Sequence, residues 1–260
     1  MAQDKLRIIP LGGLGEFGMN CTALRWQDEI IVIDAGLMFP EEELLGVDIV
    51  VPDISYLTEN REKVRGIILT HGHEDHIGGL PWILSELNVP VYGTEFTLAL
   101  VEGKLDEHHL LDDAELIEVL PGRRFTLGPF TIQPIRVTHS LADCVAYAIH
   151  TPVGVVVHTG DFKVDLSPPD GKPFDLHAFA ELGKQGVLCL LQDSTNVDRP
   201  GYTPSERAVR PRLDEIFAQT KKKLFFGKHQ AGIDNNNVIL PAERHAVHTE
   251  LAKAPQGNHA

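Results

Sequence analysis

The segment His71-Gly-His-Glu-Asp-His76 constrains this chain more than any other feature of its sequence. It places three imidazoles and two carboxylates within six residues, directly after the short apolar run 66–70 and before a segment, 77–87, with helical spacing. Neutral imidazole and carboxylate are the ligands that zinc and similar divalent ions prefer. A solvated polar loop would not require this spacing. The sequence therefore predicts a metal site on a strand-to-helix loop.

The order of the donors in this segment separates them into two sets. His71 and His73 lie two residues apart on an extended segment, so their side chains point to the same side and can hold one ion. Asp75 and His76 lie at the turn into the helix and can face a second ion. The segment by itself thus predicts two neighbouring metal positions.

Length and composition favour one main globular domain, since the 260 residues are 43% apolar and 23% charged. No apolar run approaches the roughly 20 residues that a membrane-spanning helix needs, so we expect no membrane partner. Residues 1–10 lead into a strand-like segment without the apolar core of a secretory signal. The cysteines, Cys21, Cys144 and Cys189, are odd in number and form no Cys-x-x-Cys pair. Together these features predict a cytoplasmic protein.

Charge is distributed unevenly along the chain. The net charge is −14, which argues against binding nucleic acid by bulk electrostatics, so metal ions or a partner would have to supply local positive charge. Residues 221–260 instead carry six Lys or Arg and three Asp or Glu, without sustained periodicity. We therefore expect a main domain over 1–220 and a divergent, poorly ordered tail over 221–260.

Many short strands and few helices predict an α/β (α+β) fold in which helices flank two packed sheets. The glycine-rich stretch 12–18 is interpreted as a hairpin turn, because the segment after it looks like a strand and not like the helix of a nucleotide-binding motif. Strands are expected at 6–11, 29–34, 66–70, 89–93, 115–119, 123–127, 130–137, 144–150, 153–159 and 187–192, and helices around 77–87, 95–103 and 205–219.

His-x-His-x-Asp-His after a strand resembles the signature of the metallo-β-lactamase superfamily. The likeness extends along the chain. His139, in Val-Thr-His-Ser, resembles the third histidine ligand of the family, and Asp161, in His-Thr-Gly-Asp-Phe-Lys, resembles its metal-bridging aspartate. Asp34 occupies the place of an early aspartate that orients the ligand loop by hydrogen bonds. The resemblance implies an αββα sandwich.

Five segments together resemble a narrower group, the ribonuclease J family of bacterial RNA-degrading enzymes: 10–20, 46–53, 71–79, 159–163 and 193–196. This likeness covers roughly residues 5–219 and implies a two-zinc phosphodiesterase that cleaves RNA both from the 5′ end and internally. The family continues into a β-CASP domain and a later metal-binding histidine, which the sequence after Lys221 does not resemble. We therefore expect a truncated or otherwise altered chain with an incomplete sandwich.

The resemblance implies a role for each metal ligand. His71, His73 and His139 hold the first ion, and Asp161 bridges the two ions as part of the catalytic centre. The second ion takes the remaining donors of the segment, Asp75 and His76.

Zinc is the expected ion at both positions, with manganese as the alternative, because nitrogen and oxygen donors suit both. Such ions lower the pKa of a bound water from about 15.7 to about 7. Asp75 is expected to accept the proton of the attacking water, which makes it the second catalytic residue.

Five further side chains are expected beside the ligands or in the core near them. Glu74 would orient a neighbour by a hydrogen bond and not bind metal itself. Ser140, Ser194 and Thr195 would add hydrogen bonds near the scissile group, with local turn and cap bonds as the equally open alternative. His158 lies inside a strand and is expected to be a core residue or to support a ligand.

Three functions are compatible with these features. The favoured one is a ribonuclease with RNA as its partner, its activity impaired by the truncation. The alternatives are a hydrolase of a thioester, lactam or lactone, and an inactive fragment that binds metal or a partner protein. A homo-oligomer is compatible with all three. Two measurements distinguish these hypotheses: whether the protein turns over RNA or the small substrates, and how many metal ions it binds.

Overall fold

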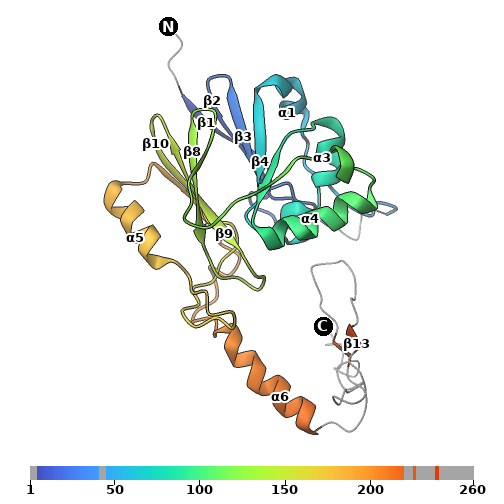
Figure 1. The fold of residues 1–260 in the computed structure, drawn as a ribbon, viewed down its shortest axis with the longest axis vertical. Helices are drawn as coiled ribbons and strands as arrows, with labels where there is room; N and C mark the ends of the chain where they lie inside the picture. The colour runs from blue at the N-terminus through green and yellow to red at the C-terminus, as the bar shows by residue number, and fades with distance from the viewer. Residues whose placement is uncertain (1–4, 41–44, 220–224, 227–237, 240–260) are drawn as a thin grey trace. The chain divides into compact units, whose positions relative to one another are not determined.

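The computed structural model describes residues 5–40, 45–219, 225–226 and 238–239, and it divides the chain into two compact units, Met1–Thr203 and Pro204–Ala260 (Figure 1). Every side chain proposed above for the site lies in the first unit. The described elements of the second are η3 (Glu206–Ala208), α6 (Val209–Gln219), β12 (Phe225–Phe226) and β13 (Val238–Ile239). Most of the predicted tail, 221–260, lies outside the described residues, so the boundary expected at residue 220 stays a prediction.

The first sheet has six strands in chain order: β1 (Leu6–Gly12), β2 (Cys21–Trp26), β3 (Glu29–Ile33), β4 (Val64–Ile68), β5 (Val91–Gly93) and β6 (Leu116–Glu118). The strands β1 to β3 are antiparallel, and β3 to β6 are parallel. The carboxyl ends of parallel strands lie at one edge of a sheet. Asp34 and the segment 69–76, which follow β3 and β4, therefore come together at that edge.

The second sheet has five strands in the order β11 (Cys189–Leu191), β10 (Gly154–His158), β9 (Val145–Thr151), β8 (Phe130–Arg136) and β7 (Phe125–Leu127). Both β8 and β10 pair antiparallel with β9, so they run in the same direction and end at the same edge. His139 follows β8 and Asp161 follows β10. A backbone bridge between Thr138 and Lys163 joins these two segments beyond the strands.

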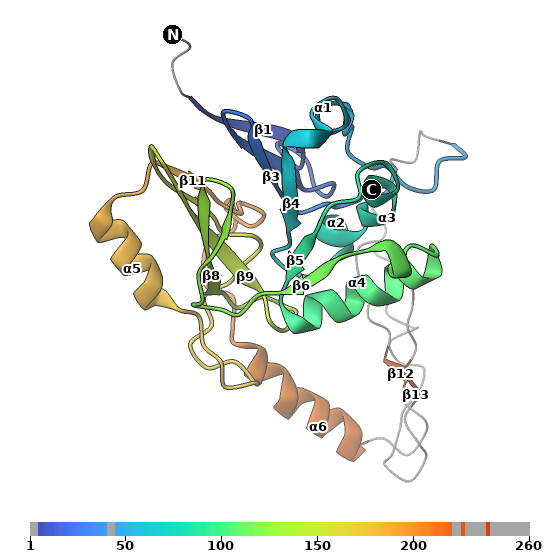
Figure 2. The same cartoon turned by 45° about the horizontal axis from the view of Figure 1, so that its top comes forward.

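Helices cover the outer face of each sheet (Figures 1 and 2). Against the first sheet lie α1 (Ser55–Glu59), η1 (Arg61–Lys63), α2 (Glu74–Ile77), α3 (Leu80–Glu86), α4 (Glu95–Glu107) and η2 (Leu111–Asp113). Against the second lies α5 (Leu176–Gln185), whose first turn is capped by Asp175, which accepts a hydrogen bond from Ala178 N at 3.0 Å. In the part of the chain that the structure describes, no helix is long and apolar enough to cross a membrane.

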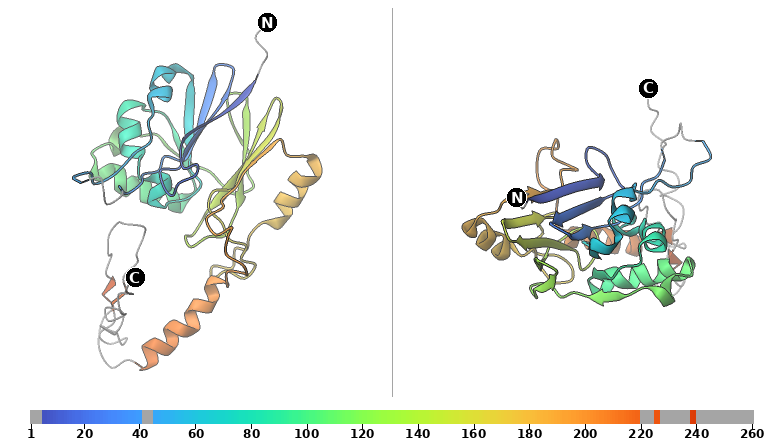
Figure 3. Two further views of the ribbon diagram at one scale, coloured as in Figure 1. Left: turned by 180° about the vertical axis from the view of Figure 1, so that it is seen from behind. Right: turned by 90° about the horizontal axis from the view of Figure 1, so that it is seen from above.

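The two sheets lie between helices on their outer sides (Figure 3). Three layers of buried apolar side chains hold this unit together. The central layer lies between the sheets and includes Leu24, Ile33, Phe130 and Tyr147, none of them more than 1% exposed. The two outer layers lie between each sheet and its helices. The predicted αββα sandwich is thereby confirmed.

Two helical segments differ from the sequence-based expectation. The helix expected over 77–87 is interrupted, because α2 ends at Ile77 and α3 begins at Leu80. The backbone between them passes so close to the segment after β3 that a Cβ on Gly79 would lie 2.6 Å from Gly36 O. The pattern also did not predict α5, since Gly183 interrupts its short apolar spacing. Its Asp175 cap was the usable signal.

Candidate metal centre

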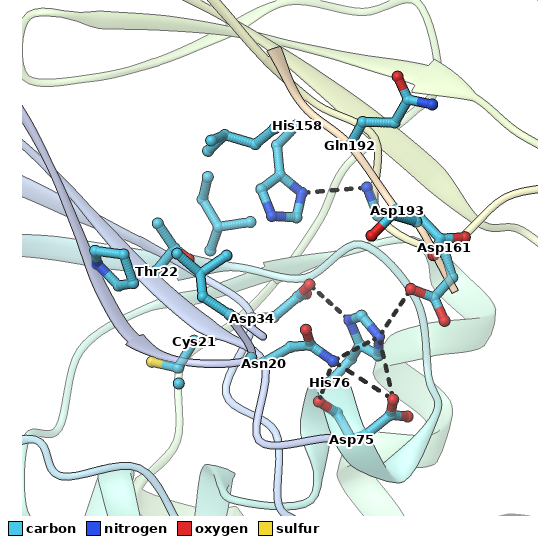
Figure 4. Close-up of a pocket in the computed structure, with 18 of the residues that line it drawn as sticks. Asn20, Cys21, Thr22, Asp34, Asp75, His76, His158, Asp161, Gln192 and Asp193 are labelled. Carbon is cyan, nitrogen blue, oxygen red and sulfur yellow. Dashed lines mark hydrogen bonds and ion pairs between the residues drawn. The ribbon is translucent and has the colours of Figure 1, made fainter. Parts of the chain in front are cut away.

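Asp34 supports the segment 71–76, which we call the metal loop. It follows β3 in a left-handed conformation (φ 60°), and its side chain is 1% exposed. Its Oδ1 accepts a hydrogen bond from Thr70 N at 2.8 Å, and its Oδ2 lies 2.8 Å from His76 Nδ1. A buried carboxylate is tolerated only with such partners. The contact with Nδ1 leaves Nε2 of His76 directed away from Asp34, towards the cavity side of the loop (Figure 4).

The backbone after Asp34 holds the metal loop at close range. Ala35 N donates to His76 O at 2.8 Å, and Leu37 N donates to Glu74 O at 3.1 Å. Between them, Gly36 lies so close that a Cβ at this position would overlap Asp75 O. Only glycine permits this approach, so the position of the loop backbone depends on residue 36.

Three imidazoles meet on one side of the metal loop. His71 Nε2 lies 3.0 Å from His73 Nδ1, and His139 Nε2 lies 3.2 Å from the same atom. Zinc–nitrogen bonds of 2.0–2.1 Å in a tetrahedron place two nitrogens roughly 3.3 Å apart, so these spacings fit a single ion. Thr70 Oγ1 lies 3.0 Å from His71 Nδ1, which leaves Nε2 of His71 available.

Asp75, His76 and Asp161 form an adjoining group (Figure 4). His76 Nε2 lies 3.6 Å from Asp75 Oδ2 and 3.4 Å from Asp161 Oδ1. The other oxygen of Asp161 lies 3.7 Å from His139 Nε2. Asp161 therefore belongs to both groups, and in each group the potential ligand atoms lie within 4.8 Å of one another. The chemistry and spacing of these donors fit a pair of divalent cations that share one carboxylate.

Burial and neighbouring charges shift the titration of these groups in opposite directions. Burial lowers the pKa of His71 well below its ordinary value, so its imidazole is neutral at physiological pH. Burial also opposes the charged form of His76, but the carboxylates of Asp34 and Asp161 outweigh it and raise the pKa of His76 well above the ordinary value. Burial raises the pKa of Asp75. A cation that binds through His76 must displace the proton whenever this imidazole is protonated.

A cavity of about 440 Å³ opens beside the second group. Its described lining includes Asn20, Asp75, His76 and Asp161 together with the glycine-rich loop 12–18 and residues 190–195. The acidic side chains of the lining are Glu16, Asp34, Asp75, Asp161 and Asp193, and there is no Lys or Arg among its described residues. An anionic ligand would therefore be repelled from this cavity unless cations occupied the metal centre.

Glu74 lies in the metal loop, but its carboxylate contacts another element. Its Oε2 is 2.8 Å from Nζ of Lys104 on α4, and both side chains are largely buried, at 22% and 17% exposure. The ion pair ties the metal loop to α4. The support of a neighbouring ligand that was expected of Glu74 stays a prediction.

The three predicted hydroxyl residues are placed differently. Ser194 and Thr195 line the cavity, whereas Ser140 is exposed and is not part of the described lining. Thr195 Oγ1 donates to Asp193 Oδ1 at 2.7 Å, and Thr195 N donates to the same atom at 2.8 Å. These two hydrogen bonds close a local turn, which is the alternative role expected for Thr195 from the sequence.

Sequence reasoning missed Asn20, which links the glycine-rich loop to the metal loop. Its Nδ2 lies 3.2 Å from His76 Nε2 and 3.1 Å from Asp75 O, and its backbone N donates to Asp75 O at 3.0 Å. The only available signal was a polar residue between a glycine-rich turn and a buried strand.

His158 is a supporting residue, since its Nδ1 accepts a hydrogen bond from Gly160 N at 3.1 Å, one residue before Asp161.

The fold and the paired histidine and aspartate groups define a class of protein. The family model described as the metallo-beta-lactamase superfamily matches residues 14–228, and this chain belongs to that superfamily. A crystal structure of a protein of unknown function from Enterococcus faecalis V583 shares the fold, with a TM-score of 0.66 and 18% identity over 88% of this chain and 61% of that one.

Curated relatives point to a narrower group. The chain is 48% identical over 243 residues to ribonuclease J of Synechocystis sp., a match that covers 92% of this chain and 38% of the relative. It is 47% identical over 253 residues to ribonuclease J of Thermus thermophilus, covering 94% of this chain and 44% of the relative. The resemblances expected from the motifs are confirmed. The chain spans less than half the length of these relatives.

Proposed function

We propose that this chain is a metal-dependent RNA phosphodiesterase of the ribonuclease J type, with both 5′ exonucleolytic and endonucleolytic activity. The observation that carries the proposal is the shared position of Asp161, which joins two donor groups beside one cavity. Two cations side by side suit in-line displacement at a phosphodiester. The similarity to ribonuclease J supports RNA as the substrate class. Free cysteines and an RNA substrate both favour the cytoplasm as the location.

The proposal assigns His71, His73 and His139 to the first cation. Asp75 and His76 belong to the second, and Asp161 is shared. Zinc is the preferred ion and manganese the alternative, because the donors are nitrogen and oxygen only.

Asp75 is the group best placed to take a proton from the attacking water. When bound, the two cations lower the pKa of a water molecule and offset the negative charge of the phosphate. In the metal-free protein, burial raises the pKa of the Asp75 carboxyl. Asn20 Nδ2, 3.4 Å from Asp75 Oδ2, keeps that carboxylate in place. His76 keeps its orientation through Asp34.

Cleavage of 5′-monophosphorylated RNA, with and without a chelator, tests the proposal. The protein purified with zinc or manganese should cleave the RNA, and the chelator should abolish cleavage until the ion is restored. Asp161→Asn should reduce the rate at least about 100-fold, because it weakens both cation positions together. Asp28→Asn, at an exposed ion pair with Lys63, is the control that should leave the rate unchanged.

The outcome separates the three functions considered for this chain. Turnover of thioester or lactam substrates alone would replace the ribonuclease with a small-substrate hydrolase. Elemental analysis that finds two ions per chain, together with RNA cleavage, supports the proposal. Fewer than two ions and no turnover of any substrate would leave the inactive fragment as the description of this chain.

A further inference from the structure

Three large apolar side chains that line the cavity beside the metal centre are exposed to solvent. Leu14 is 68% exposed and Phe17 is 75% exposed, both on the glycine-rich loop, and Leu190 of β11 is 53% exposed. Exposed apolar side chains are ordinary when scattered, but a group of them in one cavity indicates a binding surface. The rest of the lining includes the carboxylates and imidazoles described above, so the cavity has both an apolar and a polar surface.

The glycine-rich loop is fixed to the metal centre at its end. Asn20 N and Nδ2 both contact Asp75 O, at 3.0 and 3.1 Å. Gly13 and Gly18 have φ values of 83° and 90°, which only glycine adopts readily, so the bend of the loop is built into its sequence. Three residues of chain span at most about 11 Å, so the backbone of Phe17 is held close to Asp75.

A ligand that uses the whole cavity must therefore combine an anionic group with an apolar group. A nucleotide has this character, since its phosphate suits a pair of cations and its base has flat apolar faces. Aromatic side chains bind bases by stacking, and they do so with little dependence on sequence because every base has a π-face. Phe17 is the one Phe, Tyr or Trp residue of the described lining.

We propose that Leu14, Phe17 and Leu190 form a base-binding subsite for the nucleotide whose phosphate lies at the metal centre. This inference rests on the proposed ribonuclease function. The subsite explains how a cavity without Lys or Arg in its described lining holds an RNA chain: the cations bind the phosphate and the apolar surface binds the adjacent base.

The test compares adenosine 5′-monophosphate with ribose 5-phosphate, which carries the same phosphate and sugar without the base. Binding of each to the manganese-loaded full chain is measured by calorimetry, so the readout does not depend on turnover. We expect the nucleotide to bind about tenfold more tightly, from stacking of one base. Phe17→Ala should remove this preference and leave the affinity for ribose 5-phosphate unchanged, and Phe17→Trp should keep it.

Phe96→Ala is the matched control, because Phe96 is a partly exposed (38%) phenylalanine of α4 that does not line the cavity. Thermal unfolding of the Phe96→Ala variant and of the two Phe17 variants shows whether each of them is folded. Equal binding of the two ligands to the wild-type protein, or a preference that survives Phe17→Ala, would overturn the subsite. A Phe17-dependent gain for an acyl thioester, and none for the nucleotide, would overturn it as well and assign the surface to an acyl group.

The subsite and the proposed function fail in different ways. A Phe17-dependent preference for the nucleotide without RNA cleavage would refute only the ribonuclease. RNA cleavage without the preference would refute only the subsite.

Discussion

Asp34 is the residue on which the orientation of the metal loop most directly depends. It is almost fully buried, and its two oxygens contact Thr70 N, Thr70 Oγ1 and His76 Nδ1. A carboxylate in this position fixes both the rotation of the imidazole and the nitrogen that carries its proton. The Nε2 atom of His76 is therefore oriented by Asp34, a residue that belongs to neither group of potential ligands.

Asp34→Asn should weaken cation binding about 10- to 100-fold, the range found when a partner of a metal-binding histidine is removed. The amide keeps the volume of the side chain but cannot accept from both Thr70 and His76 as a carboxylate does. Competition with a zinc-sensitive dye measures the affinity. Asp28→Asn should match the wild-type protein, and an unchanged affinity in Asp34→Asn would show that His76 does not depend on this contact.

The reactivity of the three cysteines tests independently which of their side chains are buried. Burial raises the pKa of the Cys144 thiol from 9.0 to about 12, which lowers its thiolate fraction about 1000-fold. Cys21 is buried as well, whereas Cys189 is only partly buried. Iodoacetamide at pH 8 should therefore label Cys189 first in the native protein, and all three cysteines in guanidinium chloride. Mass spectrometry of the labelled peptides measures this, and native labelling of Cys144 as fast as Cys189 would contradict the packing.

At this scale, the sequence predicts residues whose chemistry is unusual and misses those whose role is geometric. The four potential ligands of the metal loop could be named because closely spaced His and Asp residues are typical of metal sites. His139 and Asp161, which are isolated in sequence, could be named only through the family resemblance. Thr70 and Asn20 could not, since a threonine before a histidine or an asparagine after a glycine-rich turn is ordinary in sequence. Their importance comes from strands and loops that are distant in the chain.

Among the elements, the metal loop is defined by its close contact with the segment after β3. The backbone hydrogen bonds from Ala35 and Leu37 hold it from one side, and the Glu74–Lys104 ion pair ties it to α4. Gly36 allows the approach of the two backbones. The loop is thus held by neighbouring segments before any ion binds.

Gly36→Ala should destabilise the protein by about 3 kcal/mol or more, the upper end of the cost of overpacking, because the added Cβ would overlap Asp75 O. It should also weaken cation binding, since Asp75 has to move. Gly103→Ala is the matched control: Gly103 lies in α4 with open space around its Cβ position, so alanine should stabilise the helix by about 0.5–1 kcal/mol. Urea unfolding measures both variants, and equal stability of the two would contradict the packing at Gly36.

Element prediction succeeded where the apolar pattern was long and failed where a backbone contact decided the outcome. The strands around residues 130–137 and 144–150 are predicted correctly because their alternating side chains face two different cores. The division of the helix at Gly78 and Gly79 was missed, since the reason for it is the passage of Gly36 and Leu37 nearby. Such contacts have no local sequence signal.

In the first unit as a whole, the candidate site joins the two sheets. The metal loop follows β4 of the first sheet, and His139 and Asp161 follow β8 and β10 of the second. The family resemblance predicted the sandwich correctly, whereas composition and periodicity alone predicted only two packed sheets with helices. How the edges of the two sheets meet depends on the central apolar layer, whose partners are far apart in sequence.

Cation binding should therefore stabilise the whole unit. A ligand that binds only the folded state at 100 times its dissociation constant adds about 2.7 kcal/mol, which for a domain of this size raises the Tm by about 5–10 °C. Circular dichroism of metal-loaded and chelator-treated protein measures the shift, and Asp161→Asn should show a smaller one. Equal Tm values with and without the ion would contradict a metal site formed by residues of both sheets.

If the proposed ligands bind two cations, their division between two sheets also affects how a newly made chain would acquire its ions. The metal loop carries four of the six proposed donors and leaves the ribosome before β8 and β10, so a cation captured early would be held by a partial set and would exchange rapidly. Release becomes slow only after His139 and Asp161 have arrived. Scarcity of the ion in a growing cell would then delay the maturation of new chains and spare those already assembled.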